Sequence, residues 1–287
     1  MSFDYFEPAT LDEALGHIAD RGDDAVVVAG GSAVAVLSRL GLARPRQVIS
    51  LRRLGELRGI AAGTDGVTIG ALTTLREVET SPLVRTSAAS LASTCATVAT
   101  VRIRQQATLG GNVAHADPAQ DPPPTLIALG AIATVAGTDG RREIPLDGFF
   151  TSWFTTVLQP DELLVGLRVP AAAAGTRATY LKFLPRTADD YATVSVAATA
   201  QTDADGRVTD ATIVLGSVGP TPMRARRAER ALIDRVPSAA DLDDVAALVR
   251  DDIDPIDDAR GRADYKQEMA RVWTARALRQ VVGQVTT

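Results

Sequence analysis

The sequence predicts an α+β protein built from three successive parts. Helix and strand patterns alternate with short connections over residues 1–58, as in a small βαβ unit. Residues 59–173 are typical of a larger α+β unit with antiparallel strands, and residues 176–287 carry a long hairpin pattern followed by helices. A chain of 287 residues is also long for one compact domain, so we expect at least two folded domains.

The first unit opens with a helix whose start is marked by a capping box. Thr10 and Glu13 have the required spacing, and the helix is expected to end near Gly22. The short apolar run at 25–29 is typical of a buried strand, a second helix follows it, and residues 47–51 are the next strand. This order predicts a parallel pair, so the turn after residue 29 lies at the carboxyl end of a strand, where ligands often bind.

The second unit is predicted to contain both strands and helices. Thr74 and Glu77 have the spacing of another capping box, and a longer helix rich in small residues is expected across 87–100. Antiparallel strands are expected at 67–71 and near 131–136, 142–146 and 162–169.

The third unit is predicted to begin after an alanine-rich linker at 171–175. Residues 192–219 contain two long strand patterns around an Asp-Gly turn, as hairpins do. Helices are expected near 222–234, 238–250 and 262–283.

Composition excludes several kinds of protein and site. No stretch approaches the roughly 20 apolar residues that span a bilayer, and the acidic N-terminal segment is unlike a signal peptide, so we expect a cytoplasmic protein without a membrane span. A net charge of −5 gives no basic surface for nucleic acid. One cysteine and two histidines exclude a disulfide, an all-protein zinc site and a cysteine-ligated iron–sulfur cluster, so redox chemistry needs a bound cofactor. We predict no metal ligand and no catalytic residue in this chain.

A first glycine pair, Gly30-Gly31, lies between the strand at 25–29 and the following helix. Backbone N–H groups and the helix N-terminus could hold an anion there, because no Cβ atom obstructs the approach. The alternative is that the turn needs glycine for steric reasons alone. The segment lacks both the Gly-x-Gly-x-x-Gly spacing and the Lys-Ser/Thr of a P-loop.

A second glycine pair, Gly110-Gly111, lies between Thr108 and Asn112, whose side chains offer a hydroxyl and an amide. Two such segments in separate units suggest a ligand lying across their junction. The alternative is a tight turn in which Thr108 and Asn112 bond their own backbone, with Asp117 and Asp121 capping the next helix.

Three long segments, in this order and spacing, resemble a known family. They are residues 29–51, 102–131 and 181–200, and the match extends to 160–170, 219–232 and 260–278. The sequence resembles the FAD-binding medium subunit of the xanthine dehydrogenase and carbon monoxide dehydrogenase family of molybdenum hydroxylases. The resemblance implies a two-part FAD-binding domain, formed by the first two units, and a C-terminal domain of antiparallel strands and helices.

The resemblance implies that the two glycine segments hold the pyrophosphate and ribityl portions of FAD. The implied contacts are Ala29, Gly30, Gly31, Ser32, Ala33 and Val34 in the first segment, and Thr108, Gly111 and Asn112 in the second. Family members often have a second hydroxyl residue and then leucine where this chain has Ala33 and Val34, so only Ser32 is left to bond phosphate through a side chain. Asp121 is expected to accept a hydrogen bond from a ribose hydroxyl.

Four further residues are implied to contact the rings of the cofactor. Leu164 is expected against the adenine or flavin ring, although it could simply be strand core. Lys182 is expected to point toward the flavin, where a positive charge favours the reduced ring, and Asp190 and Tyr191 bring polar and stacking groups. The alternatives are a strand-edge lysine paired with a carboxylate and a half-buried core tyrosine. His115 is expected to be a solvated or capping residue.

The implied function is that of an FAD-binding electron-transfer subunit of a molybdenum hydroxylase-type complex. Its partners would be an iron–sulfur small subunit and a molybdopterin large subunit, and its external acceptor NAD, a quinone or dioxygen. One alternative is a stand-alone FAD-dependent oxidoreductase that acts directly on a small molecule. Another is a flavin-free scaffold protein that keeps the fold.

Overall fold

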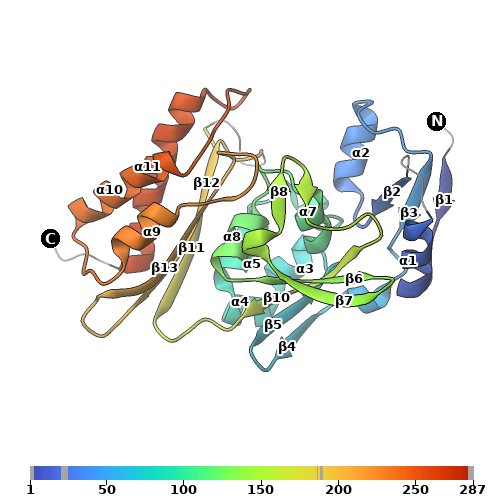
Figure 1. Ribbon diagram of the computed structural model, residues 1–287, viewed down its shortest axis with the longest axis horizontal. Coiled ribbons are helices and arrows are strands. Elements are labelled where there is room, and N and C mark those ends of the chain that lie inside the picture. Colours follow the sequence, from blue (N-terminus) through green and yellow to red (C-terminus); the bar gives the residue numbers. More distant parts are fainter. Residues whose placement is uncertain (1–2, 21–24, 186, 188–189, 284–287) are drawn as a thin grey trace.

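The computed structural model describes residues 3–20, 25–185, 187 and 190–283. Three sheets lie in a row along the longest axis of the molecule, with the N-terminal sheet at one end and the C-terminal domain at the other (Figure 1). The second unit lies between them. The predicted α+β class is confirmed, and the three sheets follow one another along the chain.

The first unit is a three-stranded parallel sheet with two helices. Its strands have the spatial order β1-β3-β2. Its elements are β1 (Asp4–Phe6), α1 (Leu11–Ala19), β2 (Ala25–Val28), α2 (Ser32–Arg39) and β3 (Gln47–Ser50). Thr10 caps α1 by accepting a hydrogen bond from the N–H of Glu13, so the predicted helix start is confirmed. Gly22, the predicted helix end, lies outside the described residues, and β1 was not predicted because a three-residue strand has no readable period.

The second unit is a five-stranded antiparallel sheet covered by helices. Its strand order is β4-β5-β10-β6-β7, and every neighbouring pair is antiparallel as predicted. The strands are β4 (Ile60–Gly63), β5 (Gly66–Gly70), β6 (Ile132–Gly137), β7 (Gly140–Pro145) and β10 (Leu163–Pro170), with the small hairpin of β8 (Phe150–Ser152) and β9 (Thr155–Thr156). The helices are α3 (Leu75–Thr80), α4 (Pro82–Ser87), α5 (Ala89–Ala96), α6 (Val101–Arg104), α7 (Leu109–His115) and α8 (Pro122–Ala128). Short 3-10 turns η1 (Gly55–Leu57) and η2 (Leu146–Gly148) complete the unit.

The helix expected across 87–100 is shorter than predicted, because α5 begins at Ala89 and ends at Ala96. The hydroxyl of Thr97 donates a hydrogen bond to the carbonyl oxygen of Thr94 at this end. Ala99 then adopts a φ of 41°, which a continuing helix does not allow. The run of small residues therefore predicted a helix but did not show where that helix ends.

The third unit is a four-stranded antiparallel sheet with helices on one face (Figure 1). Its strands are β11 (Thr176–Phe183), β12 (Val194–Thr202), β13 (Val208–Gly216) and β14 (Met223–Arg224). Its helices are α9 (Arg226–Leu232), α10 (Ala239–Ala247), the 3-10 turn η3 (Leu248–Asp251) and α11 (Ala263–Val282). The predicted hairpin is β12–β13, and Gly206 in its turn has a φ of 78°. The edge strand β11 was not predicted.

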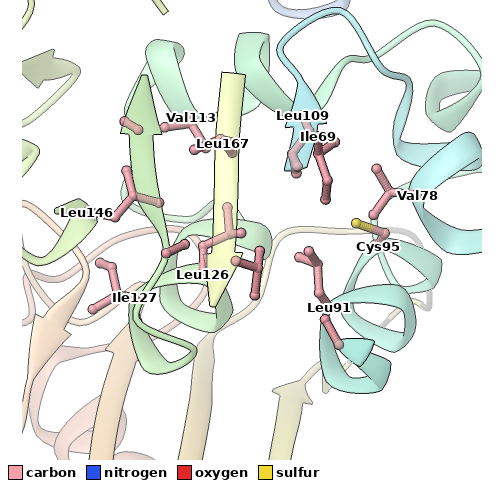
Figure 2. Packing of buried hydrophobic residues seen from close by; sticks show 14 of the residues in the cluster. Ile69, Val78, Leu91, Cys95, Leu109, Val113, Leu126, Ile127, Leu146 and Leu167 are labelled. Carbon is pink, nitrogen blue, oxygen red and sulfur yellow. The ribbon is translucent and has the colours of Figure 1, made fainter. Parts of the chain in front are cut away.

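The three parts share buried surfaces rather than standing apart. The largest cluster fills the second unit, where Cys95 packs with Leu91 and Val78 (Figure 2). It also includes Ala197 and Val214 from the third sheet. Burial raises the pKa of the Cys95 thiol, as expected for a packing residue. A second cluster joins α1 and β3 to β6 and β10, so the junction of the first two units is rigidly packed.

No helix among the described residues is long and apolar enough to cross a membrane.

Candidate functional site

A cavity of about 520 Å³ lies where the first and second units meet. Its volume is within the range of small-molecule and cofactor sites. Three stretches of chain supply its wall: the β2–α2 turn, the start of α7, and the segment that leads into β10. The lining includes ten of the residues singled out in the sequence: Ala29, Gly30, Gly31, Ser32, Ala33, Val34, Thr108, Gly111, Asn112 and Leu164.

The first glycine pair forms the N-terminus of α2. Gly31 is the N-cap residue with a left-handed φ of 74°, and no side chain of the described residues caps this helix. Helix geometry leaves the N–H groups of Ser32 and the next residues without intrahelical acceptors, so they can bind an anion. Gly30 has a different role, because a Cβ there would lie 1.9 Å from the carbonyl oxygen of Gln106. It is glycine so that two backbones can pass closely.

The second glycine pair belongs to the first turn of α7. Thr108 caps this helix by accepting a hydrogen bond from the N–H of Gly111 over 3.1 Å. A Cβ on Gly110 would lie 2.5 Å from the Cβ of Ala71, so Gly110 serves helix packing. A Cβ on Gly111 would meet Thr108 Oγ1 at 2.8 Å and the Cβ of Ala29 at 3.4 Å. The two glycine segments therefore touch at the cavity wall.

Asn112 lines this cavity and has an unpaired, buried acceptor. Its Nδ2 donates to Oε1 of Gln120, whereas its buried Oδ1 has no hydrogen-bond partner among the described residues. A buried acceptor without a donor costs about 1–3 kcal/mol, so a ligand hydroxyl at this position would be stabilising. Gln120 also lines the cavity. Sequence reasoning missed it, since nothing in its spacing separates it from an ordinary loop residue.

Asp121 and Lys182, singled out separately in the sequence, form one buried ion pair. Lys182 Nζ lies 2.8 Å from Asp121 Oδ2, and the two side chains are only 5% and 4% exposed. Lys182 also donates to the carbonyl oxygen of Thr97, and the Tyr180 hydroxyl donates to Asp121 Oδ1. Burial raises the pKa of Asp121, against the lowering effects of Lys182 and Tyr180.

This pair bears on the alternatives that the sequence left open. Asp121 occupies the N-cap position of α8 but makes no capping hydrogen bond, so the capping role given as an alternative is wrong for this residue. Lys182 has the carboxylate partner that one alternative required. Neither residue is among the described residues that line the 520 Å³ cavity.

Asp190 and Tyr191 line a second cavity of about 280 Å³ next to Arg260. Tyr191 is 41% exposed, and its backbone N–H donates a hydrogen bond to Asp190 Oδ1. The Arg260 guanidinium lies 5.1 Å from the centroid of the Tyr191 ring. His115, in contrast, lines the first cavity, and its ring packs 5.4 Å from that of Phe154. Burial lowers the pKa of His115. It is therefore a half-buried wall residue rather than a solvated or capping one.

Comparisons with known proteins agree with this geometry. Residues 1–172 match the FAD binding domain in molybdopterin dehydrogenase, and residues 179–281 match the CO dehydrogenase flavoprotein C-terminal domain. The carbon monoxide dehydrogenase medium chain of Hydrogenophaga pseudoflava is 34% identical over 276 residues, 96% of each chain. The 6-hydroxypseudooxynicotine dehydrogenase complex subunit alpha of Paenarthrobacter nicotinovorans is 33% identical and covers 96% of this chain and 93% of its own length.

A solved structure of carbon monoxide dehydrogenase from Hydrogenophaga pseudoflava contains a chain with the same fold. It superposes with a TM-score of 0.94 at 36% identity and covers 98% of this chain and 97% of its own. The uncapped helix N-terminus and the unpaired Asn112 acceptor fit a dinucleotide with phosphate and hydroxyl groups. The chain therefore belongs to the FAD-binding medium-chain family of carbon monoxide dehydrogenases, xanthine dehydrogenases and related molybdenum hydroxylases.

Proposed function

We propose that this chain receives electrons from an iron–sulfur small subunit and passes them to an external acceptor: NAD, a quinone or dioxygen. A molybdopterin large subunit would carry out the substrate chemistry. One cysteine and two histidines cannot supply a cysteine-ligated cluster, so the centre that feeds the flavin must belong to another chain. We place the complex in the cytoplasm. Within this chain, we propose that the three structural units are residues 1–58, 59–173 and 176–287.

The β2–α2 turn would hold the pyrophosphate of FAD. The free N–H groups at the start of α2 point out of the helix end, and the helix dipole favours negative charge there. Ser32 adds a hydroxyl, whereas Ala33 and Val34 can contribute only backbone N–H groups and contact area. Ala29 closes the wall against Gly111.

The start of α7 would hold the ribityl portion. Asn112 Oδ1 is the observation that carries this assignment, because a ligand hydroxyl would satisfy this buried acceptor. Thr108 acts indirectly, since its hydroxyl holds the helix turn in place by capping Gly111. Leu164, 6% exposed on β10, would lie against a ring of the cofactor.

The flavin end would be served by residues of the second and third units. We place Lys182, Asp190 and Tyr191 there. Asp121 lies beside Lys182, and we keep its contact with a ribose hydroxyl of the cofactor as a proposal. Bound FAD would accept electrons one at a time from an iron–sulfur donor and release them singly or in pairs. The protein contributes a buried positive charge at Lys182 Nζ, neutralised by Asp121, and an aromatic ring at Tyr191.

The test is purification of the full chain alone and together with its native partners. We expect one non-covalent FAD per chain, which acid treatment releases, and slow transfer of electrons from artificial donors to dioxygen or a dye. Turnover of an organic substrate should require the partners. Steady turnover by the chain alone would establish a stand-alone oxidoreductase instead, and a colourless protein would establish a scaffold.

A variant tests the placement of the ribityl group. Asn112→Leu keeps the branched shape of the side chain but removes the unpaired acceptor, so FAD should bind about tenfold more weakly. Gln201→Leu is the matched control, because Gln201 bonds Ala174 in the C-terminal domain. Equal FAD affinity in the two variants would contradict the assignment of Asn112.

A further inference from the structure

We infer that Arg260 is a positioning residue for Tyr191, and that the C-terminal helix α11 thereby sets the orientation of the aromatic ring proposed to face the flavin. The inference rests on the proposed function, because that proposal places Tyr191 at the flavin. It goes further by assigning a role to a residue of the C-terminal domain, about 70 positions away in the sequence.

The contact itself joins two loops. Tyr191 lies near the end of the loop between β11 and β12, whose base is closed by the hydrogen bond from Thr193 N–H to the carbonyl oxygen of Phe183. Arg260 comes from the loop before α11, and its guanidinium lies 5.1 Å from the centroid of the Tyr191 ring. Tyr191 still has 41% of its surface exposed, which leaves part of the ring free for a planar ligand.

The guanidinium is oriented toward the ring at the expense of a hydrogen bond. Arg260 Nε is buried and has no hydrogen-bond partner in the part of the chain that the structure describes. Its nearest carboxylate, Asp258, lies 3.6 Å from Nη1, which is long for a hydrogen bond. The guanidinium therefore has two partners, the carboxylate of Asp258 and the face of the Tyr191 ring, the latter in a cation–π contact.

The loop that carries Arg260 is fixed by α11. Lys266, 2% exposed on that helix, places its Nζ 2.8 Å from Asp258 Oδ2. The other oxygen of Asp258 accepts hydrogen bonds from the backbone N–H groups of Arg260 and Gly261 at 2.8 and 3.2 Å. The backbone at Arg260 is thus held without help from its own side chain.

Because the backbone at Arg260 is held by Asp258, the Arg260 side chain can be replaced without loss of these backbone hydrogen bonds. Arg260→Met removes the cation but keeps the backbone hydrogen bonds to Asp258, so the fold should be retained. Arg279→Met is the matched control, because Arg279 is a partly exposed arginine of the same domain that pairs with Asp243. Arg260→Lys restores a cation and tests whether charge alone is enough.

Two measurements on the full chain separate the inference from the proposal beneath it. The first is fluorine NMR of the protein labelled with 3-fluorotyrosine, in which the chain's four tyrosines give four signals and Tyr191→Phe identifies one. Arg260→Met should shift the Tyr191 signal and leave the other three in place. The second is FAD affinity, which should weaken about fivefold, the effect of one partly exposed cation–π contact.

The expected pattern is a changed Tyr191 signal and weaker FAD binding in Arg260→Met, partial recovery in Arg260→Lys, and neither effect in Arg279→Met. If the wild-type chain binds FAD but Arg260→Met leaves both readouts unchanged, the inference fails and the proposed function stands. A shifted Tyr191 signal with unchanged affinity would also overturn it. A wild-type chain without FAD would overturn both.

Discussion

Replacing Lys182 with methionine should destabilise the chain by an amount that grows with pH. The Asp121 side chain is only 4% exposed, and the substitution removes the Lys182 cation that lies 2.8 Å from its carboxylate. The hydrogen bond from the Tyr180 hydroxyl is then the remaining side-chain contact described for this carboxylate. Removing one partner of a buried ion pair typically costs about 3–5 kcal/mol, a large share of the roughly 5–15 kcal/mol that hold a protein folded.

The pH dependence follows from the pKa of Asp121. Burial already raises this pKa above 3.8, and Lys182 acts to lower it, so the substitution raises it further. Between the unfolded and folded pKa values, the folded variant holds a proton that the unfolded chain has lost. Stability therefore falls as pH rises through that window. The cost of Lys182→Met should be smaller at pH 5 than at pH 8.

Urea unfolding at both pH values measures this effect. The double variant Lys182→Met/Asp121→Asn removes both charges, so it should be more stable at pH 8 than Lys182→Met alone, and its loss should depend little on pH. The reasoning would be refuted if Lys182→Met lost the same free energy of unfolding at pH 5 and at pH 8. It would also be refuted if the single and double variants lost equal free energies at pH 8.

Four further predictions follow from the same structure. Lys182→Met should lower the reduction potential of bound FAD more at pH 8 than at pH 6, because proton uptake by Asp121 compensates for the lost charge at lower pH; potentiometric titration measures it. Gly111→Val should deplete FAD in the purified protein, since a Cβ there meets atoms 2.8 and 3.4 Å away; released flavin is counted against protein. Burial lowers the pKa of His115, so the folded chain binds fewer protons there than the unfolded chain, and stability falls as pH drops through this window; His115→Gln should reduce that loss in urea unfolding between pH 7 and pH 5. Gly16→Ala should stabilise the chain by about 0.5–1 kcal/mol, because a Cβ in α1 meets nothing within 4 Å; thermal unfolding should show a higher midpoint.

The family and the cofactor could be predicted from the sequence because they depend on short, ordered motifs. Capping spacings such as Thr10 with Glu13 act within one turn of helix and are visible without a structure. The glycine segments likewise indicated a ligand site. Ten of the fourteen residues that the resemblance implied as cofactor contacts line one cavity. The family and FAD assignments are confirmed, whereas the individual ligand contacts stay predictions.

Other features were beyond the sequence because partners far apart in the chain create them. Gly30 and Gly110 have the same local signature as Gly31 and Gly111, but only packing against Gln106 and Ala71 shows that they serve close backbone approach.

The buried pair shows the same division. Asp121 and Lys182 each carry a charge whose partner cannot be read locally, since 61 positions separate them. The sequence determined that a helix begins after Asp121 and which residues could contact a cofactor. Only the packing of β11 against the second unit decided that the Asp121 carboxylate pairs with Lys182 and does not cap α8. In a buried position, an ion pair stabilises a carboxylate more than a capping hydrogen bond does.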